Sequence, residues 1–168
     1  PINDNPDIPN FKINKKKIKK NQNILDVDSI DGFSMLFNLE KFNNNDLFDE
    51  NFFLYLENDD LCLRAKKRNE HIFVIQNSKI NHKGGISIDN EHENLRNWHW
   101  MWSKYYFNKK HYGSLNALYK IFWNMISSSI KILFYFLVLD NKKRKKNQMR
   151  VSGIINSILG KKSWYRIK

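Results

Sequence analysis

The sequence predicts a mixed α/β region followed by a helical region, and three observations lead to this fold class. Short β-forming runs that end in turn residues recur between residues 24 and 90. A three-turn helical pattern, acidic at its start and basic at its end, lies among them. From about residue 91, aromatic and apolar stretches of helical length alternate with lysines. We therefore expect a basic polar loop or mobile segment over residues 1–23, an α/β part over 24–90 and a helical part over 91–168.

Composition limits the class of protein and of partner. The 168 residues suffice for one domain, or for one domain with an appendage, and 14% aromatic residues favour a packed core. The net charge of +12 favours an anionic partner, although Asn, Lys and Ile are abundant throughout and compositional bias accounts for part of it. Cys62 is the single cysteine, which favours a reducing compartment. The chain opens on Pro1 in a loop-like string without a signal peptide, so we expect the later part of a longer protein.

The α/β part divides into short elements. Residues 24–38, ILDVDSIDGFSMLFN, predict a strand, a turn at Gly32 and a second strand. LEKFNNNDLFDEN predicts a short helix that an Asn-rich loop closes. ENDDLCLRAKKRN predicts a helix of about three turns, with Asn69 at the left-handed position that ends many helices. HIFVIQ predicts a buried strand, and SKINHKGGIS predicts a short strand that runs into a Gly-Gly turn.

The aromatic run FFLY meets an acidic cluster, Glu-Asn-Asp-Asp, at residues 57–60, and this cluster has two interpretations. Carboxylates at a helix N-terminus satisfy free N–H groups and complement the helix dipole, and Asp60 stands four residues before Arg64, with which it can pair. However, the aromatic run brings the acids to the end of a buried segment, where a carboxylate is costly unless a charge lies opposite. Carboxylates in such places are typical of general bases and metal-facing groups.

Three strings, GFSMLFNLEKF, LFDENFFLYLENDDLCLRAKK and INHKGGIS, occur in this order with short gaps. Together they resemble the acceptor-side half of inverting family 2 glycosyltransferases of the GT-A fold, notably the rhamnosyltransferase-like branch. The resemblance covers residues 24–88 almost continuously, and the strings KKHYG and GKKSWYRI resemble the ends of such proteins. It implies a partial, Rossmann-like GT-A half with a mixed sheet, followed by C-terminal helices.

The resemblance implies transfer of a sugar from a nucleotide-sugar donor to a glycan or lipid-linked acceptor, with inversion, in the synthesis of cell-envelope polysaccharide. A carboxylate at the start of the helix deprotonates the acceptor hydroxyl, while a divalent metal, Mg or Mn, steadies the departing diphosphate. Glu57 and Asp60 match the family's Glu and second Asp, whereas Asn58 stands where many members have the Asp assigned as base. Because an amide cannot accept a proton, we predict that Glu57 is the base, with Asp60 as the other candidate, unless catalysis is lost.

The turn at the end of the resemblance has an implied role beside the diphosphate. His82 matches a position that is a metal ligand in several relatives, and a surface or capping role is the alternative. Gly84, Gly85 and Ser87 form the donor-side turn, where residues without side chains let backbone N–H groups approach phosphate oxygens.

The resemblance implies that Gly32, Phe33 and Ser34 line the acceptor pocket, while the alternative is that Gly32 only makes a turn. Structural support, rather than catalysis, is expected of three residues that would brace the loop beneath the site: Asp49, Glu50 and Arg64.

The string DVD at residues 26–28 looks like the Asp-x-Asp metal motif of these enzymes, but its position argues against that role. In the fold, that motif follows a nucleotide-binding βαβ half of about a hundred residues. Only 25 residues precede Asp26, and they are polar and basic. We therefore assign DVD to the acceptor-side strand and expect the main metal ligands upstream of Pro1. The 168 residues alone are then not expected to bind a nucleotide sugar.

Residues 118–139 are apolar over nearly the length that spans a bilayer, and the basic run 142–146 follows. Lys120, Asn124 and Lys131 weaken the hypothesis of a spanning helix. Two hypotheses remain beside it: a helix that lies on the inner face of the plasma membrane, held by anionic lipids, and a core helix packed against the α/β part. The first predicts a cytoplasmic protein that is peripheral to that membrane.

Two other classes of function compete with the enzyme. A nucleic-acid-binding protein fits the charge and the aromatic residues among bases in 96–112, but no known nucleic-acid motif occurs and the acids at 57–60 would oppose the ligand. A catalytically inactive, truncated module with a membrane- or partner-binding role fits Asn58 and the expected absence of the first half.

Overall fold

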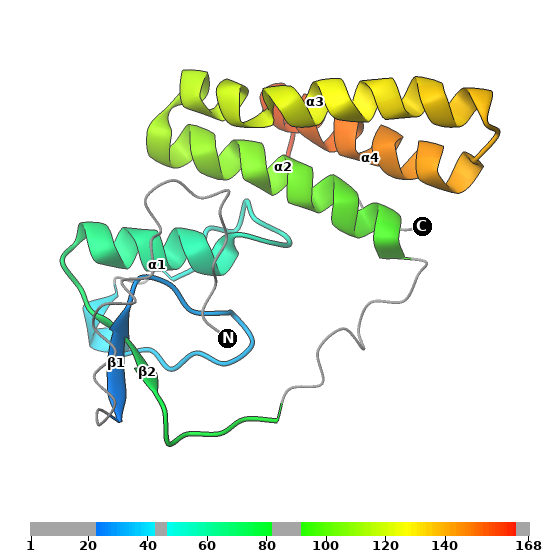
Figure 1. The fold of residues 1–168 in the computed structure, drawn as a ribbon. Coiled ribbons are helices and arrows are strands. Elements are labelled where there is room, and N and C mark those ends of the chain that lie inside the picture. Colours follow the sequence, from blue (N-terminus) through cyan, green and yellow to red (C-terminus); the bar gives the residue numbers. More distant parts are fainter. Residues whose placement is uncertain (1–22, 43–46, 82–91, 164–168) are drawn as a thin grey trace. The chain divides into compact units, whose positions relative to one another are not determined.

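The structure, a computed structural model, describes residues 23–42, 47–81 and 92–163. Over these residues the chain is mixed α/β and mostly helical, with four α-helices and one two-stranded sheet (Figure 1). The coarse fold class predicted from the sequence is therefore confirmed. The GT-A half itself stays a prediction.

The first of two compact units, which we call the α/β unit, consists of residues 1–49 and 57–83. Its described elements are β1 (Ile24–Val27), a 3-10 helix (Leu39–Lys41), α1 (Glu57–Lys67) and β2 (Ile72–Ile75). The strands pair antiparallel, with Leu25 opposite Val74 and Val27 opposite Ile72. We expected a mixed sheet, and over the described residues the structure contains this antiparallel pair of strands.

The strand pair buries one of its two faces. Leu25 and Val27 are buried, whereas Ile24, Phe73 and Ile75 on the other face are each more than half exposed. Successive residues of a strand point to opposite faces, so a two-stranded pair covered on one side leaves every second side chain in solvent. HIFVIQ thus forms a strand as predicted, but the prediction that this strand is buried is wrong.

The strand predicted after Gly32 does not form in residues 33–38. The ring of Phe37 instead makes edge-to-face contacts with two other phenylalanines, Phe42 and Phe48, each at a centroid distance of 5.9 Å. The short helix predicted next is confirmed as the 3-10 helix, whose first turn is capped by Asn38, since Oδ1 accepts the N–H of Glu40 at 3.1 Å. A short strand was also expected within SKINHKGGIS. Residues 78–81 do not form a strand, and the rest of this string lies outside the described residues.

Helix α1 matches its prediction closely. It covers three turns, with acidic residues in its first turn and Arg64, Lys66 and Lys67 in its last. Asn69 has a φ of 59°, the left-handed conformation expected of the residue that ends this helix. Local sequence was sufficient here because caps and charges at both ends agreed with one helix.

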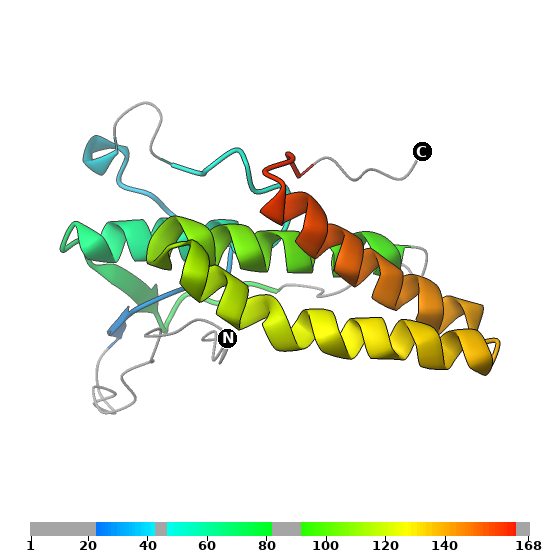
Figure 2. The same cartoon turned by 90° about the horizontal axis from the view of Figure 1, so that it is seen from above.

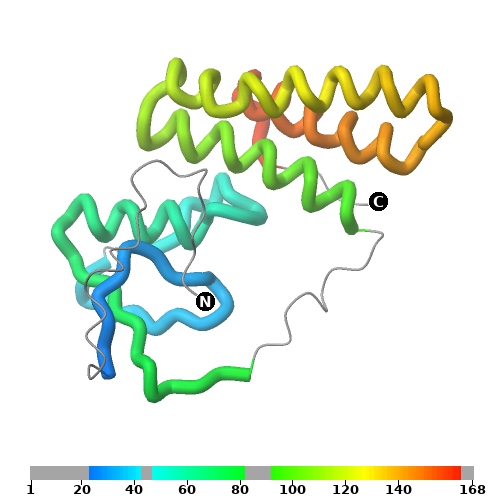
Figure 3. The backbone as a smooth tube through the Cα atoms, viewed as in Figure 1, coloured from blue at the N-terminus to red at the C-terminus, as the bar shows by residue number. Residues whose placement is uncertain are grey.

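The second unit, which we call the helical unit, consists of residues 50–56 and 84–168. It contains α2 (Glu93–Tyr112), α3 (Ser114–Leu137) and α4 (Asn141–Ile158), and its backbone reverses direction between successive helices (Figures 2 and 3). Gly113, with a φ of 85°, separates α2 from α3. Asp140 caps α4, since its Oδ1 accepts the N–H of Lys143 at 3.0 Å.

Helices α2 and α4 pack closely and run in parallel. The indole of Trp98 donates to Ser152 at 3.1 Å, and one turn further along, Ser157 Oγ donates to the carbonyl of Trp102 at 2.9 Å. Gly153 lies between these bonds, where a Cβ atom would meet the backbone of Trp98. The core beside this contact is formed by buried side chains of all three helices: Met101, Tyr105, Ala117, Ile121 and Ile154.

The aromatic run FFLY packs on α2. Its rings contact three rings of that helix in edge-to-face or tilted geometry, at centroid distances of 4.9, 4.9 and 5.4 Å: Phe52 with Tyr106, Phe53 with His99, and Tyr55 with Trp100. The carbonyl of Leu54 accepts a hydrogen bond from Ser103 at 2.9 Å. The aromatic run therefore belongs to the helical unit, although α1 of the α/β unit begins only two residues after it, at Glu57.

Helix α3 and the turn after it contain residues 118–139. Among the described helices, none has both the length and the apolar character needed to cross a membrane. One side of α3 packs against α2 and α4 through buried Ala117, Ile121 and Ser128. The opposite side is exposed.

Candidate functional site

The backbone that leads into α1 is strained. Tyr55 and Leu56 have φ angles of 71° and 66°, a left-handed conformation that non-glycine residues rarely adopt and that costs about 1–3 kcal/mol each. The surroundings hold this conformation, because Arg96 Nε donates to the Tyr55 hydroxyl at 2.9 Å and Leu56 is buried. Such strain is concentrated at functional sites, so it independently points to the start of α1, where Glu57 is the first helical residue.

Two of the three carboxylates in the acidic cluster are used by the fold. Asp59 is 2% exposed and accepts a hydrogen bond from Ser29 Oγ at 2.8 Å. Asp60 is 0% exposed and accepts from Arg64 Nε at 2.8 Å, which confirms the predicted pair. Arg64 also donates to the carbonyl of Leu47, in agreement with its expected bracing role. Asp59 therefore ties α1 to the segment at Ser29, and Asp60 holds Arg64, which reaches the carbonyl of Leu47.

Glu57 differs from these two aspartates. Its Oε2 atom is shielded from solvent and has no hydrogen-bond partner among the described residues. A buried polar atom without a partner is costly and rare in native proteins. Of the two candidates for the base, Glu57 therefore has an oxygen that no described residue bonds, whereas Asp60 is held by Arg64.

Asn58 fixes the turn that contains Gly32. Its side-chain N–H donates to the carbonyl of Ile30 at 2.8 Å, and its Cβ lies 3.5 Å from where a Cβ on Gly32 would be. A carboxylate in this place would set an acceptor against an acceptor, so the amide suits this contact where an ionised Asp would not. Asn58 thus has a structural role: it holds the 30–32 turn.

The predicted acceptor segment lies at this turn. Gly32, Phe33 and Ser34 are all exposed, and the contact with Asn58 brings Gly32 beside the first turn of α1. Asp49 is half-buried and Glu50 is exposed, and the division between the two units falls between them.

Four predicted site residues, His82, Gly84, Gly85 and Ser87, lie outside the described residues. Their roles stay predictions.

The DVD string lies in β1 and the residue after it, as predicted, and its first carboxylate forms ion pairs within the unit. Asp26 accepts from Lys66 Nζ at 2.9 Å and lies 2.7 Å from His71 Nδ1. Partial burial alone would raise the pKa of Asp26, but the hydrogen bonds from Lys66 and His71 outweigh it and lower that pKa. Over residues 23–42, 47–81 and 92–163, no group of three His, Cys, Asp or Glu side chains could hold a metal ion.

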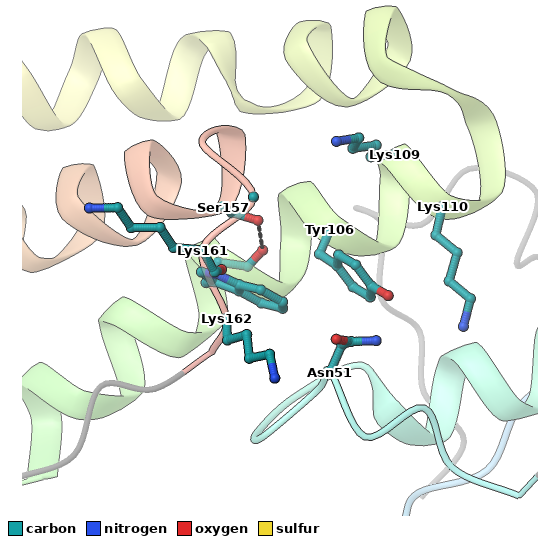
Figure 4. A pocket seen from close by; sticks show the side chains of 9 residues that line it. Asn51, Tyr106, Lys109, Lys110, Ser157, Lys161 and Lys162 are labelled. Carbon is teal, nitrogen blue, oxygen red and sulfur yellow. Dashed lines mark hydrogen bonds between the residues drawn. The ribbon is translucent and has the colours of Figure 1, made fainter. Parts of the chain in front are cut away.

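The helical unit has a cleft of about 330 Å³ that sequence analysis did not anticipate (Figure 4). Trp102 and Tyr106 stack in its wall at a centroid distance of 5.0 Å, and the Trp102 indole donates to the carbonyl of Lys161 at 2.9 Å. Lys110 and Lys162 lie on either side of Asn51 in Figure 4, whereas Lys161 points away. Amines at the rim of an aromatic-walled cleft suit an anionic ligand.

The signal for this cleft was present in the sequence as two similar strings. KKHY in α2 and KKSW after α4 each place a lysine pair near an aromatic residue, and the fold brings the two pairs to one cleft. Their proximity depends on the parallel packing of α2 and α4, which the sequence does not state.

No protein-family model matches the chain, and comparison with curated proteins and with solved structures found no significant match.

Proposed function

We propose that this chain supplies the acceptor side of an inverting glycosyltransferase, which moves a sugar from a nucleotide-sugar donor to a hydroxyl group of a glycan or lipid-linked acceptor. The observation that carries the proposal is the difference between the three carboxylates of the acidic cluster. Asp59 and Asp60 are buried and hydrogen-bonded, whereas Glu57 follows two strained residues and keeps an oxygen without a partner among the described residues. A general base needs a lone pair held at a fixed place.

In the proposed reaction, Glu57 accepts the proton of the acceptor hydroxyl while that oxygen bonds to the anomeric carbon of the donor sugar. The bond from this carbon to the donor phosphate oxygen breaks, and its electron pair leaves with the nucleoside diphosphate. Attack on the face opposite to the leaving group inverts the anomeric configuration. Loss of that proton from Glu57 after the product leaves makes the group ready for the next turnover.

The contact between Asn58 and the Gly32 turn supports the proposal that this chain forms the acceptor side of the enzyme. The segment that resembles an acceptor-pocket lining lies beside the first turn of α1, and Asn58 holds it there through the carbonyl of Ile30. Because its amide is engaged as a donor and cannot accept a proton, Asn58 positions the acceptor segment and Glu57 reacts.

The exposed face of the β1–β2 pair supports a further half outside residues 1–168. Ile24, Phe73 and Ile75 on that face are apolar and exposed, as expected of a sheet that further strands or another layer would cover. We assign the nucleotide-binding half and the main metal ligands to that sequence. The described residues offer no group of side chains that could hold that metal.

The experiment uses the complete gene product that contains residues 1–168, incubated with a panel of nucleotide sugars and a lipid-linked glycan fraction. We expect release of the nucleoside diphosphate that depends on the acceptor, together with a product whose anomeric configuration is inverted by NMR. A rhamnose donor is the first to test. No acceptor-dependent release with any donor, or a product of retained configuration, would contradict the proposal.

A catalytically inactive module with a membrane- or partner-binding role is the second candidate. The observation that favours it is the surface of the helical unit, which combines an excess of positive charge with a long exposed apolar face. This candidate and the enzyme are separated by the transfer experiment, because a binding module releases no nucleoside diphosphate.

A further inference from the structure

We propose that helix α3 lies in the plane of an anionic lipid bilayer surface, with its exposed apolar side chains in the boundary between headgroups and acyl chains. This inference concerns the helical unit and does not depend on glycosyltransferase activity. It is carried by the exposure, the charge and the aromatic contacts of α3 and of the turn that follows it.

The two sides of α3 differ in burial. Ala117, Ile121 and Ser128, spaced by four and seven residues, face the core with α2 and α4. On the other side, eight large apolar residues are 52–85% exposed, and we call them the α3 apolar face: Leu115, Tyr119, Phe122, Trp123, Ile130, Leu133, Phe134 and Leu137. Their spacings of mostly three, four or seven residues place them along one side of the helix.

A continuous apolar surface of this kind marks a site of association. Soluble monomers rarely expose large contiguous apolar patches, and isolated exposed leucines need no explanation. Here the exposed side chains run along the whole of a 24-residue helix and continue into Val138 and Leu139 beyond it. The opposite side of the helix is occupied by protein, so a partner would cover the apolar face alone.

The charge of this region selects the partner. Residues 93–168 hold 16 of the 29 Lys and Arg residues but 2 of the 17 Asp and Glu residues, a net charge of +14. Residues 1–92 hold the other 13 and 15, a net charge of −2. The two carboxylates of the basic part are themselves paired with lysines, Glu93 with Lys146 at 2.6 Å and Asp140 with Lys143 at 3.1 Å.

Basic groups lie beside the aromatic residues at the C-terminal end of α3. Lys143 Nζ is 5.5 Å from the ring centroid of Tyr135, and the guanidinium of Arg144 is 5.6 Å from that of Phe136. The sequence also places Lys109 and Lys110 shortly before α3 begins. An exposed apolar face that contains aromatic residues and has cations near both ends has the chemistry of a helix at a membrane interface, where the cations meet anionic headgroups.

This combination favours a bilayer over a second copy of the chain. If two copies met through their α3 apolar faces, two regions 93–168, each of net charge +14, would be brought together, and like charges oppose such association. An anionic leaflet instead receives both the apolar side chains and the charge, and each Lys or Arg near its surface strengthens binding about fivefold. The inference therefore names acidic phospholipid as the ligand class.

The first test is co-sedimentation of the 168-residue chain with vesicles. We expect binding to vesicles of phosphatidylcholine mixed with phosphatidylglycerol, much weaker binding to pure phosphatidylcholine, and a loss of binding as salt is raised. Equal binding to both kinds of vesicle, or no binding to the anionic ones at low salt, would overturn the proposal.

Matched variants locate the surface. The double variant Leu133→Glu, Leu137→Glu should bind anionic vesicles at least about tenfold more weakly, because two inserted side chains become charged. Leu36→Glu, at a 98% exposed leucine of the α/β unit, is the control and should bind as the unchanged chain does. All three changed positions are exposed, so far-UV circular dichroism should be unaltered in each variant.

Charge variants separate the headgroup contribution. Lys142→Gln with Lys145→Gln should weaken binding to anionic vesicles about 25-fold, at about fivefold for each lysine. Lys67→Gln with Arg68→Gln, two exposed bases of the α/β unit, is the control and should leave binding unchanged. Sedimentation velocity without lipid tests whether a second copy of the chain covers the α3 apolar face instead. The proposal would be overturned if the unchanged chain formed a dimer, if Leu133→Glu with Leu137→Glu abolished that dimer, and if the chain did not bind anionic vesicles.

Discussion

The two units use their polar residues in different ways. In the α/β unit, Asp59 and Asp60 are buried. Asp59 accepts a hydrogen bond from Ser29, and Asp60 accepts one from Arg64 of the same helix. In the helical unit, bases greatly outnumber acids, and several lie at the surface beside exposed apolar residues. The first arrangement fixes a small number of groups in place, as a reaction site requires. The second presents a broad surface, as association requires.

The string FFLYLENDD connects the helical unit to the α/β unit. Its aromatic part packs on α2, and its acidic part begins α1, with the strained residues Tyr55 and Leu56 between them. The carboxylates are therefore not in the middle of an apolar core. They follow a run that is anchored in one unit and open a helix in the other.

The largest effect that sharpens this comparison is expected at Gly153 in the helical unit. A Cβ there would lie against the backbone of Trp98, which cannot move without separating α2 from α4, so Gly153→Ala should lower the free energy of unfolding by about 3 kcal/mol. Gly32→Ala in the α/β unit is the matched control. Its Cβ would make an ordinary contact with Asn58 at 3.5 Å, so a change within about 0.5 kcal/mol is expected. Urea denaturation measures both, and equal values would contradict the close packing of α2 and α4.

The next effect is expected at the pair of Asp60 and Arg64. Asp60→Asn removes the charge that faces Arg64 in a buried place, and the free energy of unfolding should fall by about 2–3 kcal/mol. Glu70→Gln is the control, because its pair with Lys41 is 3.6 Å long and exposed, and its loss should be below about 0.5 kcal/mol. If the two variants unfold at the same urea concentration, the structural role assigned to Asp60 is wrong.

A smaller, pH-dependent effect is expected at Asp26. The hydrogen bonds from Lys66 and His71 lower its pKa below the unfolded value, so its contribution to stability is present above about pH 4 and is lost as pH falls through the lower, folded pKa. Asp26→Asn should therefore cost about 0.5–1 kcal/mol at pH 7. The difference from the unchanged chain should shrink toward zero in strong acid. A constant difference from pH 7 to pH 2 would contradict the ion pairs.

Local signals sufficed to predict α1, the strand at residues 24–27 and the left-handed Asn69, because each depends on residues close in sequence. The strand expected after Gly32 failed because β-forming residues make a strand only where a partner strand supplies hydrogen bonds. The prediction that HIFVIQ is buried is wrong for a different reason. Its apolar run carries no information on whether one or two faces of the sheet are covered.

The candidate site was predicted in part. The residues of the acidic cluster were named from the sequence, but the means of distinguishing Glu57 from Asp60 came from their partners in space. The left-handed backbone at Tyr55 and Leu56 has no signal in the sequence, since neither residue favours it and only long-range packing holds it. Residues 118–139 allowed three hypotheses because an apolar run does not say which of its sides the protein covers.

The measurement that tests the central claim most directly is the rate of sugar transfer by Glu57→Gln in the complete gene product. Gln keeps the shape of the side chain but cannot take a proton, so kcat should fall about 10²–10⁴-fold while the dissociation constant of the donor and the unfolding midpoint stay unchanged. Glu70→Gln, a partly exposed carboxylate of the same unit, should retain full activity. Near-normal transfer by Glu57→Gln would contradict the account, because the carboxylate without a partner would then have no part in the reaction.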